Sequence, residues 1–176
     1  YFQGQYDDDG QLFETEETGR LDHGVFYAPQ SLVDDDGRTI TFGWLEEDRD
    51  ASSQWDAGWS GAVSIPRRVS TTEDGTLRID PVGEIEQLHG AHHRLTDLEV
   101  GPTDENLVDV EGDALDIEVE FEPGNAREIG LVLRASPDGR ERTPIVCHPR
   151  HRQVIVERDE SSLDSRANSS RQWMPI

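Results

Sequence analysis

The stretch VFYAPQSLVDDDGRTITFGWLE, residues 25–46, decides the fold class. It holds two runs rich in β-branched and aromatic side chains, residues 25–33 and 38–46, on either side of Asp34-Asp35-Asp36-Gly37. An Asp-Gly turn between two such runs is a strong signal for a β-hairpin, because both residues tolerate the backbone angles of a tight turn. The stretch therefore predicts two antiparallel strands.

The same pattern continues along the chain, with turn residues recurring about every ten positions, as in proteins built from short strands. Residues 115–122 alternate apolar and acidic side chains, which is typical of a half-buried strand. Only residues 82–88 have helical spacing, and they mark a junction between two parts. The remaining runs that predict strands are 1–7, 62–70, 76–80, 129–134, 143–147 and 153–158, the last two around a hairpin tip at 148–151.

The charge of the chain is strongly unbalanced. It has 38 acidic residues against 16 basic ones, a net charge of −22 over 176 residues, and every basic residue is Arg. Such a surface repels itself in dilute buffer, and molar salt screens that repulsion. The composition therefore predicts a protein from a salt-adapted organism, either in a salt-rich cytoplasm or secreted; an acidic interaction protein is the alternative.

The composition also excludes some partners. Nucleic-acid binding requires clustered Lys and Arg, which this acidic chain does not offer. No apolar run approaches the about 18 residues of a transmembrane helix, so no membrane partner is predicted. Cys147 is the single cysteine, so no internal disulfide is expected.

Four segments, in order, resemble glycoside hydrolase family 32, which includes invertases, levanases, inulinases and other β-fructosidases. They are LDHGVFYAPQ (21–30), FGWL (42–45), WSGAVSIPR (59–67) and residues 77–88. Residues 129–134 and 154–158 are similar to strands of the family's C-terminal module. The resemblance implies an all-β fold: the last blades of a five-bladed β-propeller over residues 1–81, a linker helix over 82–90, and part of a β-sandwich over 91–176.

The resemblance also implies an activity, retaining hydrolysis of fructosyl bonds in sucrose or fructans. Retention needs two carboxyl groups about 5 Å apart, a nucleophile and an acid/base. In the family these lie in Asn-Asp-Pro and Glu-Cys motifs, and this chain contains neither an Asn-Asp nor a Glu-Cys pair. No catalytic residue is therefore assigned; both motifs are expected upstream of Tyr1, and both ends of the chain read as truncated.

Four residues are predicted to bind substrate. Asp22 matches the family position that contacts the sugar or its leaving group, and Tyr27 and Trp44 match positions that line the fructose subsite. Trp55 lies in a Gly- and Ser-rich loop, residues 50–61, that borders the outer pocket in the family. Three of them have a stated structural alternative: an Asp that starts a turn for Asp22, and packing for Tyr27 and Trp44.

No metal or cofactor is predicted. The Asp34-Asp35-Asp36 run is interpreted as a hairpin tip rather than a calcium loop, and the spacing of Cys147, His148 and His151 fits no standard zinc pattern. The predicted partner is a fructose-containing sugar (sucrose, inulin or levan), with self-association or pairing with the missing part of the propeller as further interactions. Two other functions stay open: a non-catalytic carbohydrate-binding or interaction module, and an inactive product of a split gene.

Overall fold

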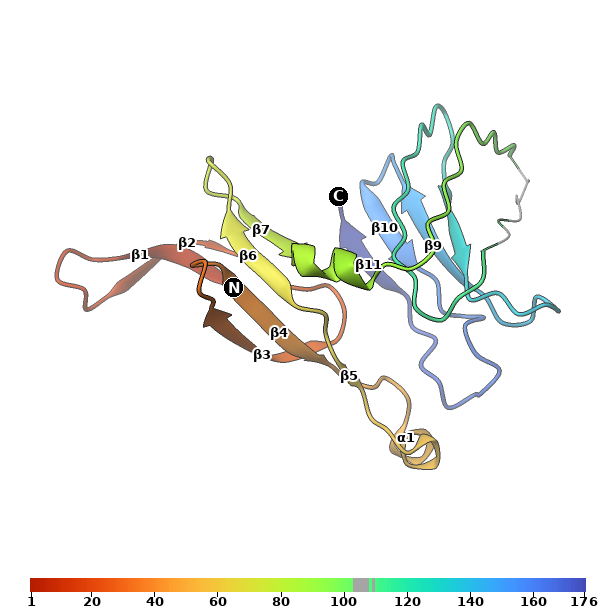
Figure 1. Cartoon of the computed structure of the whole chain (residues 1–176), viewed down its shortest axis with the longest axis horizontal. Coiled ribbons are helices and arrows are strands. Elements are labelled where there is room, and N and C mark those ends of the chain that lie inside the picture. The colour runs from red at the N-terminus through yellow and green to blue at the C-terminus, as the bar shows by residue number, and fades with distance from the viewer. Residues whose placement is uncertain (103–107, 109) are drawn as a thin grey trace.

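The chain folds into three antiparallel sheets, in a computed structural model that describes residues 1–102, 108 and 110–176. A projecting hairpin pairs β1 with β2, a central sheet has the order β3-β4-β6-β7 with β5 beside β4, and a third sheet has the order β11-β10-β9-β8 (Figure 1). The strands are β1 (Phe2–Tyr6), β2 (Phe13–Thr18), β3 (Phe26–Val33), β4 (Thr39–Leu45), β5 (Ala62–Val63), β6 (Arg67–Thr71), β7 (Leu77–Pro81), β8 (Ile129–Leu133), β9 (Thr143–His148), β10 (Gln153–Val156) and β11 (Gln172–Pro175).

The hairpin predicted around the Asp-Gly turn is confirmed as β3 and β4. Asp34 closes the turn: its Oδ1 accepts hydrogen bonds from the backbone N–H of Asp36 at 3.1 Å and of Arg38 at 2.8 Å. Gly37 has a φ of 75°, a left-handed conformation that glycine adopts without steric cost. The carboxylate of Asp34 thus serves the turn, as the hairpin interpretation expects.

A β-bulge that was not predicted interrupts the start of β3. Tyr27 pairs with Trp44 and Gln30 with Phe42, so two residues of β3 stand opposite one of β4. Ala28, inside the bulge, has a φ of 47°. Bulges bend a strand and re-aim its side chains, and here the bulge follows the residue pair Tyr27 and Trp44.

The single strand predicted over residues 62–70 is wrong, because the segment forms two separate strands. It divides into β5, which pairs with the end of β4, and β6, which pairs with its beginning. Pro66 lies between them and has no N–H to donate to a ladder. Its carbonyl accepts a hydrogen bond from the N–H of Val82 at 3.1 Å, just before the 3-10 helix η1 (Gly83–Leu88), which lies in the segment with helical spacing.

In the third sheet, three predicted strands are confirmed as β8, β9 and β10, and β11 is an addition. The strand predicted over residues 115–122 is wrong: none is assigned there within the described part of the chain. Its apolar residues Leu115, Ile117 and Val119 are 45–51% exposed. Alternation predicts that one face can be buried, but a strand also needs a hydrogen-bonded neighbour.

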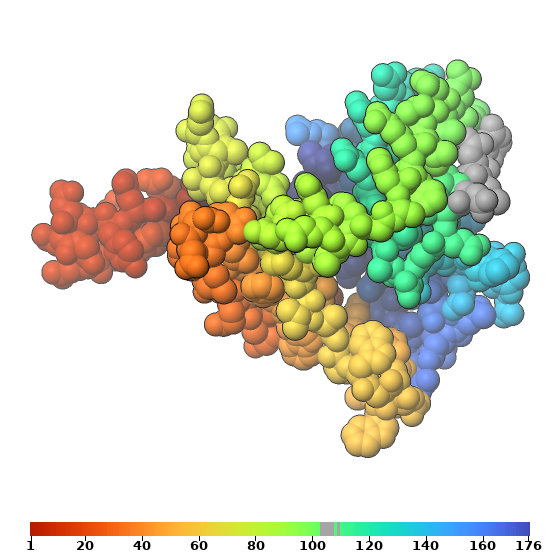
Figure 2. Space-filling view, in the orientation of Figure 1, coloured from red at the N-terminus to blue at the C-terminus, as the bar shows by residue number. Residues whose placement is uncertain are grey.

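The segment predicted as a loop over residues 50–61 contains a helix, α1 (Ala51–Ala57). Asp50 caps its beginning by accepting a hydrogen bond from the N–H of Ser53, and Gly58 ends it in a left-handed conformation. The helix stands out from the lower edge of the molecule (Figure 2).

None of the helices in the described residues is long and apolar enough to cross a membrane.

The apolar core of the described residues is small, since only Ile40 and Val82 are buried apolar side chains. The net charge of −22 opposes such a weakly packed fold. We therefore expect the melting temperature to rise from low to molar sodium chloride, as the Debye length shrinks to about 3 Å at about 1 M.

Circular dichroism melts in sodium chloride and sodium sulfate at equal ionic strength would check this expectation. Screening predicts similar stabilisation by the two salts. A much larger effect of sulfate would instead indicate preferential exclusion from the protein surface, and an unchanged melting temperature would contradict the prediction.

Candidate functional site

Asp22 is the centre of the candidate site, and Arg67 of β6 holds it in place. Arg67 Nη1 donates to Asp22 Oδ2 at 2.5 Å, and the N–H of Gly24 donates to Asp22 Oδ1 at 2.6 Å. The side chains of the pair are about one-fifth exposed, at 20% for Asp22 and 21% for Arg67. One oxygen is thus fixed by a charged partner and the other by the backbone, which sets the orientation of the carboxylate.

Arg67 is in turn supported by an aromatic ring. Its guanidinium lies over the ring of Phe26, with 4.6 Å from the central carbon to the ring centroid, in cation–π geometry. The ring lies against Gly43 of β4, where any Cβ would collide with it. Gly43, Phe26, Arg67 and Asp22 therefore form a continuous stack from the sheet to the carboxylate.

The charge of Asp22 follows from this stack. Partial burial by itself raises the pKa of the carboxyl, but the hydrogen bonds from Arg67 and Gly24 and the positive charge of Arg67 outweigh it. The pKa of Asp22 therefore lies below its ordinary value, and the group is ionised at neutral pH. An ionised carboxylate only accepts hydrogen bonds, which suits a partner rich in hydroxyl groups.

Tyr27 and Trp44 are the next two residues predicted to bind substrate. They are paired across β3 and β4, with ring centroids 6.3 Å apart and an interplanar angle of 67°. Tyr27 is 59% exposed and Trp44 39% exposed, so both keep surface available to a ligand. Asp22 precedes β3 at this same end of the hairpin. Because successive residues of a strand point to opposite faces, Tyr27 and Trp44 lie on the face opposite the stack of Gly43, Phe26 and Arg67.

Trp55 lies apart from the other three, on α1 after the end of β4, and is 87% exposed. Trp59, beyond the same helix, lies under the guanidinium of Arg49 at 4.6 Å. Arg49 also forms an ion pair with Glu47 at 2.8 Å. Trp59 therefore has an internal partner, whereas the indole of Trp55 projects into solvent.

Sequence reasoning assigned no role to Arg67 or Phe26. Both lie inside the matched segments WSGAVSIPR and LDHGVFYAPQ. The signal that could have identified them is the requirement that a partly buried carboxylate have a partner. That requirement names no partner until the fold places β6 beside β4.

Among the described residues, no group of three or more His, Cys, Asp or Glu side chains could hold a metal ion. His148 and His151 approach with ring centroids 6.3 Å apart, and His148 Nδ1 lies 3.7 Å from Glu128 Oε1.

Replacing Arg67 with Gln removes the charge that lowers the pKa of Asp22 and leaves the burial that raises it. We expect a higher Asp22 pKa in Arg67→Gln, measured by ¹³C NMR titration of the carboxyl. In the native protein the pair stabilises the fold above the unfolded value of about 3.9, and this contribution is lost as the pH falls through the lower folded pKa.

The control is Arg68→Gln, because Arg68 is the next residue of β6 and pairs with Asp80 rather than Asp22. It should leave the Asp22 titration unchanged. An Asp22 pKa that is equal in wild type and Arg67→Gln would show that Arg67 does not set the charge of the carboxyl.

Comparison with known proteins gives matches over nearly the whole chain. The model of the glycosyl hydrolases family 32 N-terminal domain matches residues 1–81, and that of the family 32 C-terminal domain matches residues 84–175. A fructan 1-exohydrolase of Leymus chinensis is 36% identical over 107 residues, which are 58% of this chain and 18% of that protein. A sucrose-6-phosphate hydrolase of Staphylococcus xylosus is 29% identical over 163 residues, covering 92% of this chain and 32% of that protein.

Among solved structures, fructan 1-exohydrolase IIa from Cichorium intybus in complex with 1-kestose superposes with a TM-score of 0.72 and 20% identity, over 98% of this chain and 41% of that one. The likeness confirms the predicted all-β fold, the last blades of a propeller followed by part of a sandwich. The chain thus spans less than half the length of these relatives. It belongs to glycosyl hydrolase family 32, and the stack that orients Asp22 lies within its N-terminal domain match.

Proposed function

We propose that this chain is the part of a β-fructosidase-type glycoside hydrolase that positions the fructosyl unit of sucrose, inulin or levan. Family membership supports the reaction class, and the names of the relatives, a fructan 1-exohydrolase and a sucrose-6-phosphate hydrolase, agree with such substrates. The two catalytic carboxylates would come from residues outside this chain, since its sequence has neither an Asn-Asp nor a Glu-Cys pair.

The observation that carries the proposal is a fixed, ionised carboxylate at the same end of the hairpin as two exposed aromatic rings. Asp22 has committed each oxygen to one donor, and a carboxylate offers about four acceptor positions, so both oxygens can accept further hydrogen bonds. Sugar hydroxyls are suitable donors, and bonds to a charged acceptor are stronger than neutral ones. Tyr27 and Trp44 offer apolar surface for a sugar face and, at their polar atoms, contacts for its edge.

In the complete enzyme, Asp22 would accept hydrogen bonds from the hydroxyl groups of the bound sugar. Retaining hydrolysis requires the anomeric carbon to lie between two carboxyl groups about 5 Å apart, so a misplaced ring reacts slowly. Because Arg67 and Gly24 fix the carboxylate before substrate arrives, little reorganisation is needed during the reaction. Asp22 would thus act by positioning rather than by proton transfer.

A non-catalytic carbohydrate-binding module is the alternative that a specific observation favours. The exposed rings of Tyr27, Trp44 and Trp55 could bind a sugar without any catalytic pair. The two functions differ in one outcome: a binding module leaves sucrose and fructans intact even when the whole natural protein is used.

Self-association, or pairing with another part of a propeller, would fit the exposed edge strand β3.

We expect Asp22→Ala in the whole natural protein to lower kcat/KM for sucrose about 10- to 100-fold, because a hydrogen bond to a charged group contributes about 1.5–3 kcal/mol. Release of glucose from sucrose, followed over a range of substrate concentrations, measures this effect. The matched control is Asp36→Ala, at the exposed hairpin tip, which should leave kcat/KM unchanged. An unaltered kcat/KM in Asp22→Ala would remove Asp22 from the substrate site.

A further inference from the structure

Helix α1 cannot be held by hydrophobic packing. It has only seven residues, and isolated helices shorter than about 12–15 residues are marginal in water. Ser53 is its one buried residue, and Trp55 points into solvent with 87% exposure. The order of α1 must therefore come from polar contacts at its ends and sides.

Some of these contacts come from the helix's own loop. Asp50 Oδ1 accepts from the N–H of Ser53 at 2.7 Å and from Ser52 Oγ at 2.9 Å. Gln54 Nε2 donates to the carbonyl of Arg49 at 2.7 Å, and Ser60 Oγ donates to Gln54 Oε1 at 2.7 Å. These contacts shape the loop, but they do not fix it to the rest of the molecule.

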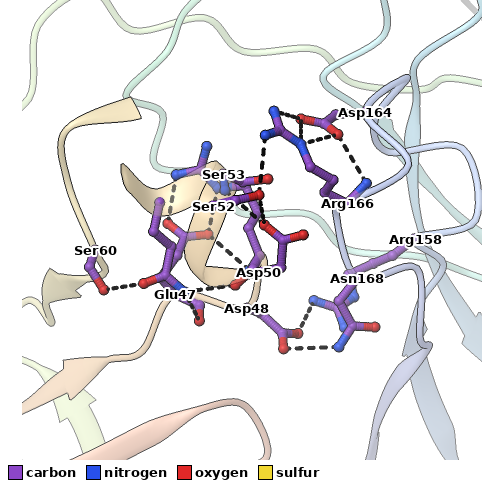
Figure 3. Close-up of polar contacts among 12 residues, drawn as sticks. Glu47, Asp48, Asp50, Ser52, Ser53, Ser60, Arg158, Asp164, Arg166 and Asn168 are labelled. Carbon is purple, nitrogen blue, oxygen red and sulfur yellow. Dashed lines mark hydrogen bonds and ion pairs between the residues drawn. The ribbon is translucent and has the colours of Figure 1, made fainter. Parts of the chain in front are cut away.

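The fixed point is Arg166, which belongs to the C-terminal domain match (Figure 3). Its Nη1 donates to Asp56 Oδ2 of α1 at 2.8 Å and lies 3.4 Å from Ser52 Oγ. Its carbonyl accepts from the N–H of Asp50, the capping residue, at 3.4 Å. A single residue of the C-terminal domain thus contacts the beginning and the side of the helix.

Arg166 is itself held rigid by Asp164. Arg166 Nε lies 3.0 Å from Asp164 Oδ1, and Nη2 lies 2.8 Å from Oδ2, a two-point contact that sets the plane of the guanidinium. The hydrogen bonds from the Arg166 side chain and backbone lower the pKa of Asp164 to about 2. The pair therefore stays ionised down to acid pH, and Nη1 remains directed at α1.

A second contact fixes the chain that leads into α1. Asp48 Oδ2 accepts from Arg158 Nη1 at 2.8 Å, and Asp48 Oδ1 accepts from Asn168 Nδ2 at 2.9 Å (Figure 3). Arg158 is anchored through its Nε to the carbonyl of Ser170 at 2.6 Å. Both carboxylate oxygens of Asp48, two residues before the helix cap, are thus held by the C-terminal domain.

We propose that the C-terminal domain positions the Trp55 surface of the N-terminal domain, with Arg166 as the positioning residue and Arg158 supporting it through Asp48. This inference rests on the proposed function for one step only, the contact of Trp55 with a fructoside. An ordered helix presents the indole in one direction, so less conformational freedom is lost when a sugar ring stacks on it. Arg166 would therefore affect sugar affinity without touching the sugar.

Hydrogen exchange on this chain tests the positioning step. In Arg166→Gln, we expect the amides of Gln54 and Gly58, which bond within α1, to exchange about tenfold faster, while those of β4 keep their rates. Arg166→Lys should restore part of the protection, because a Lys can pair with Asp56 but cannot make the two-point contact with Asp164 as well. Arg150→Gln, exposed at the β9–β10 turn, is the control and should match wild type. Equal rates in wild type and Arg166→Gln would overturn the inference.

The ligand step has a separate readout. The protein is labelled with 5-fluorotryptophan, and the Trp55 resonance is assigned by its loss in Trp55→Phe. Titration with 1-kestose should shift that resonance in wild type. In Arg166→Gln, the same shift should require a several-fold higher concentration of sugar. Equal sugar affinity in the two proteins would overturn the effect of Arg166 on binding. A wild-type resonance that does not respond would refute the fructoside contact of Trp55, whereas the exchange rates alone decide whether Arg166 holds α1.

Discussion

The contact between a guanidinium and a carboxylate is the interaction on which the described structure depends. Ile40 and Val82 are the only buried apolar side chains among the described residues, and most apolar side chains of β9 and β10 are half-buried. Arg158 joins the third sheet to the chain before α1 through Asp48, and Arg67 joins β6 to the segment before β3 through Asp22. Arg38 contacts both Asp34 of the hairpin turn and Glu84 of η1, each at 2.7 Å.

The use of Arg alone among the basic residues fits this role. A guanidinium is planar, always charged and able to contact two carboxylates at once, as Arg38 and Arg166 do. Pairs that are partly buried are screened less by salt than the diffuse repulsion among exposed acids. An acidic surface and a set of arginine contacts are therefore compatible, and the same contact that joins the elements also orients Asp22.

Local features were predictable from the sequence, and features that depend on a distant partner were not. The hairpin of β3 and β4 follows from an Asp-Gly turn between two β-rich runs. Asp22 was selected from the segment that contains it, and its contact with a sugar stays a prediction. The bulge at Ala28 and the pairing of Arg67 with Asp22 depend on which strands become neighbours. The strand predicted over residues 115–122 was wrong for the same reason, since alternation describes one strand and not its partner.

Helix α1 was not predicted, although Asp50 and Gly58 are recognisable caps, because the segment between them lacks an apolar stripe.

A double-mutant cycle on Asp48 and Arg158 tests most directly whether arginine–carboxylate contacts join the two parts of the chain. The side chains are 33% and 19% exposed, so the pair is partly shielded from water. Free energies of unfolding would be measured by urea denaturation for wild type, Asp48→Asn, Arg158→Gln and the double variant. If the contact joins the two parts, the cycle gives a favourable coupling of about 1 kcal/mol or more. A coupling indistinguishable from zero would contradict that role and leave backbone pairing and packing as the source of cohesion.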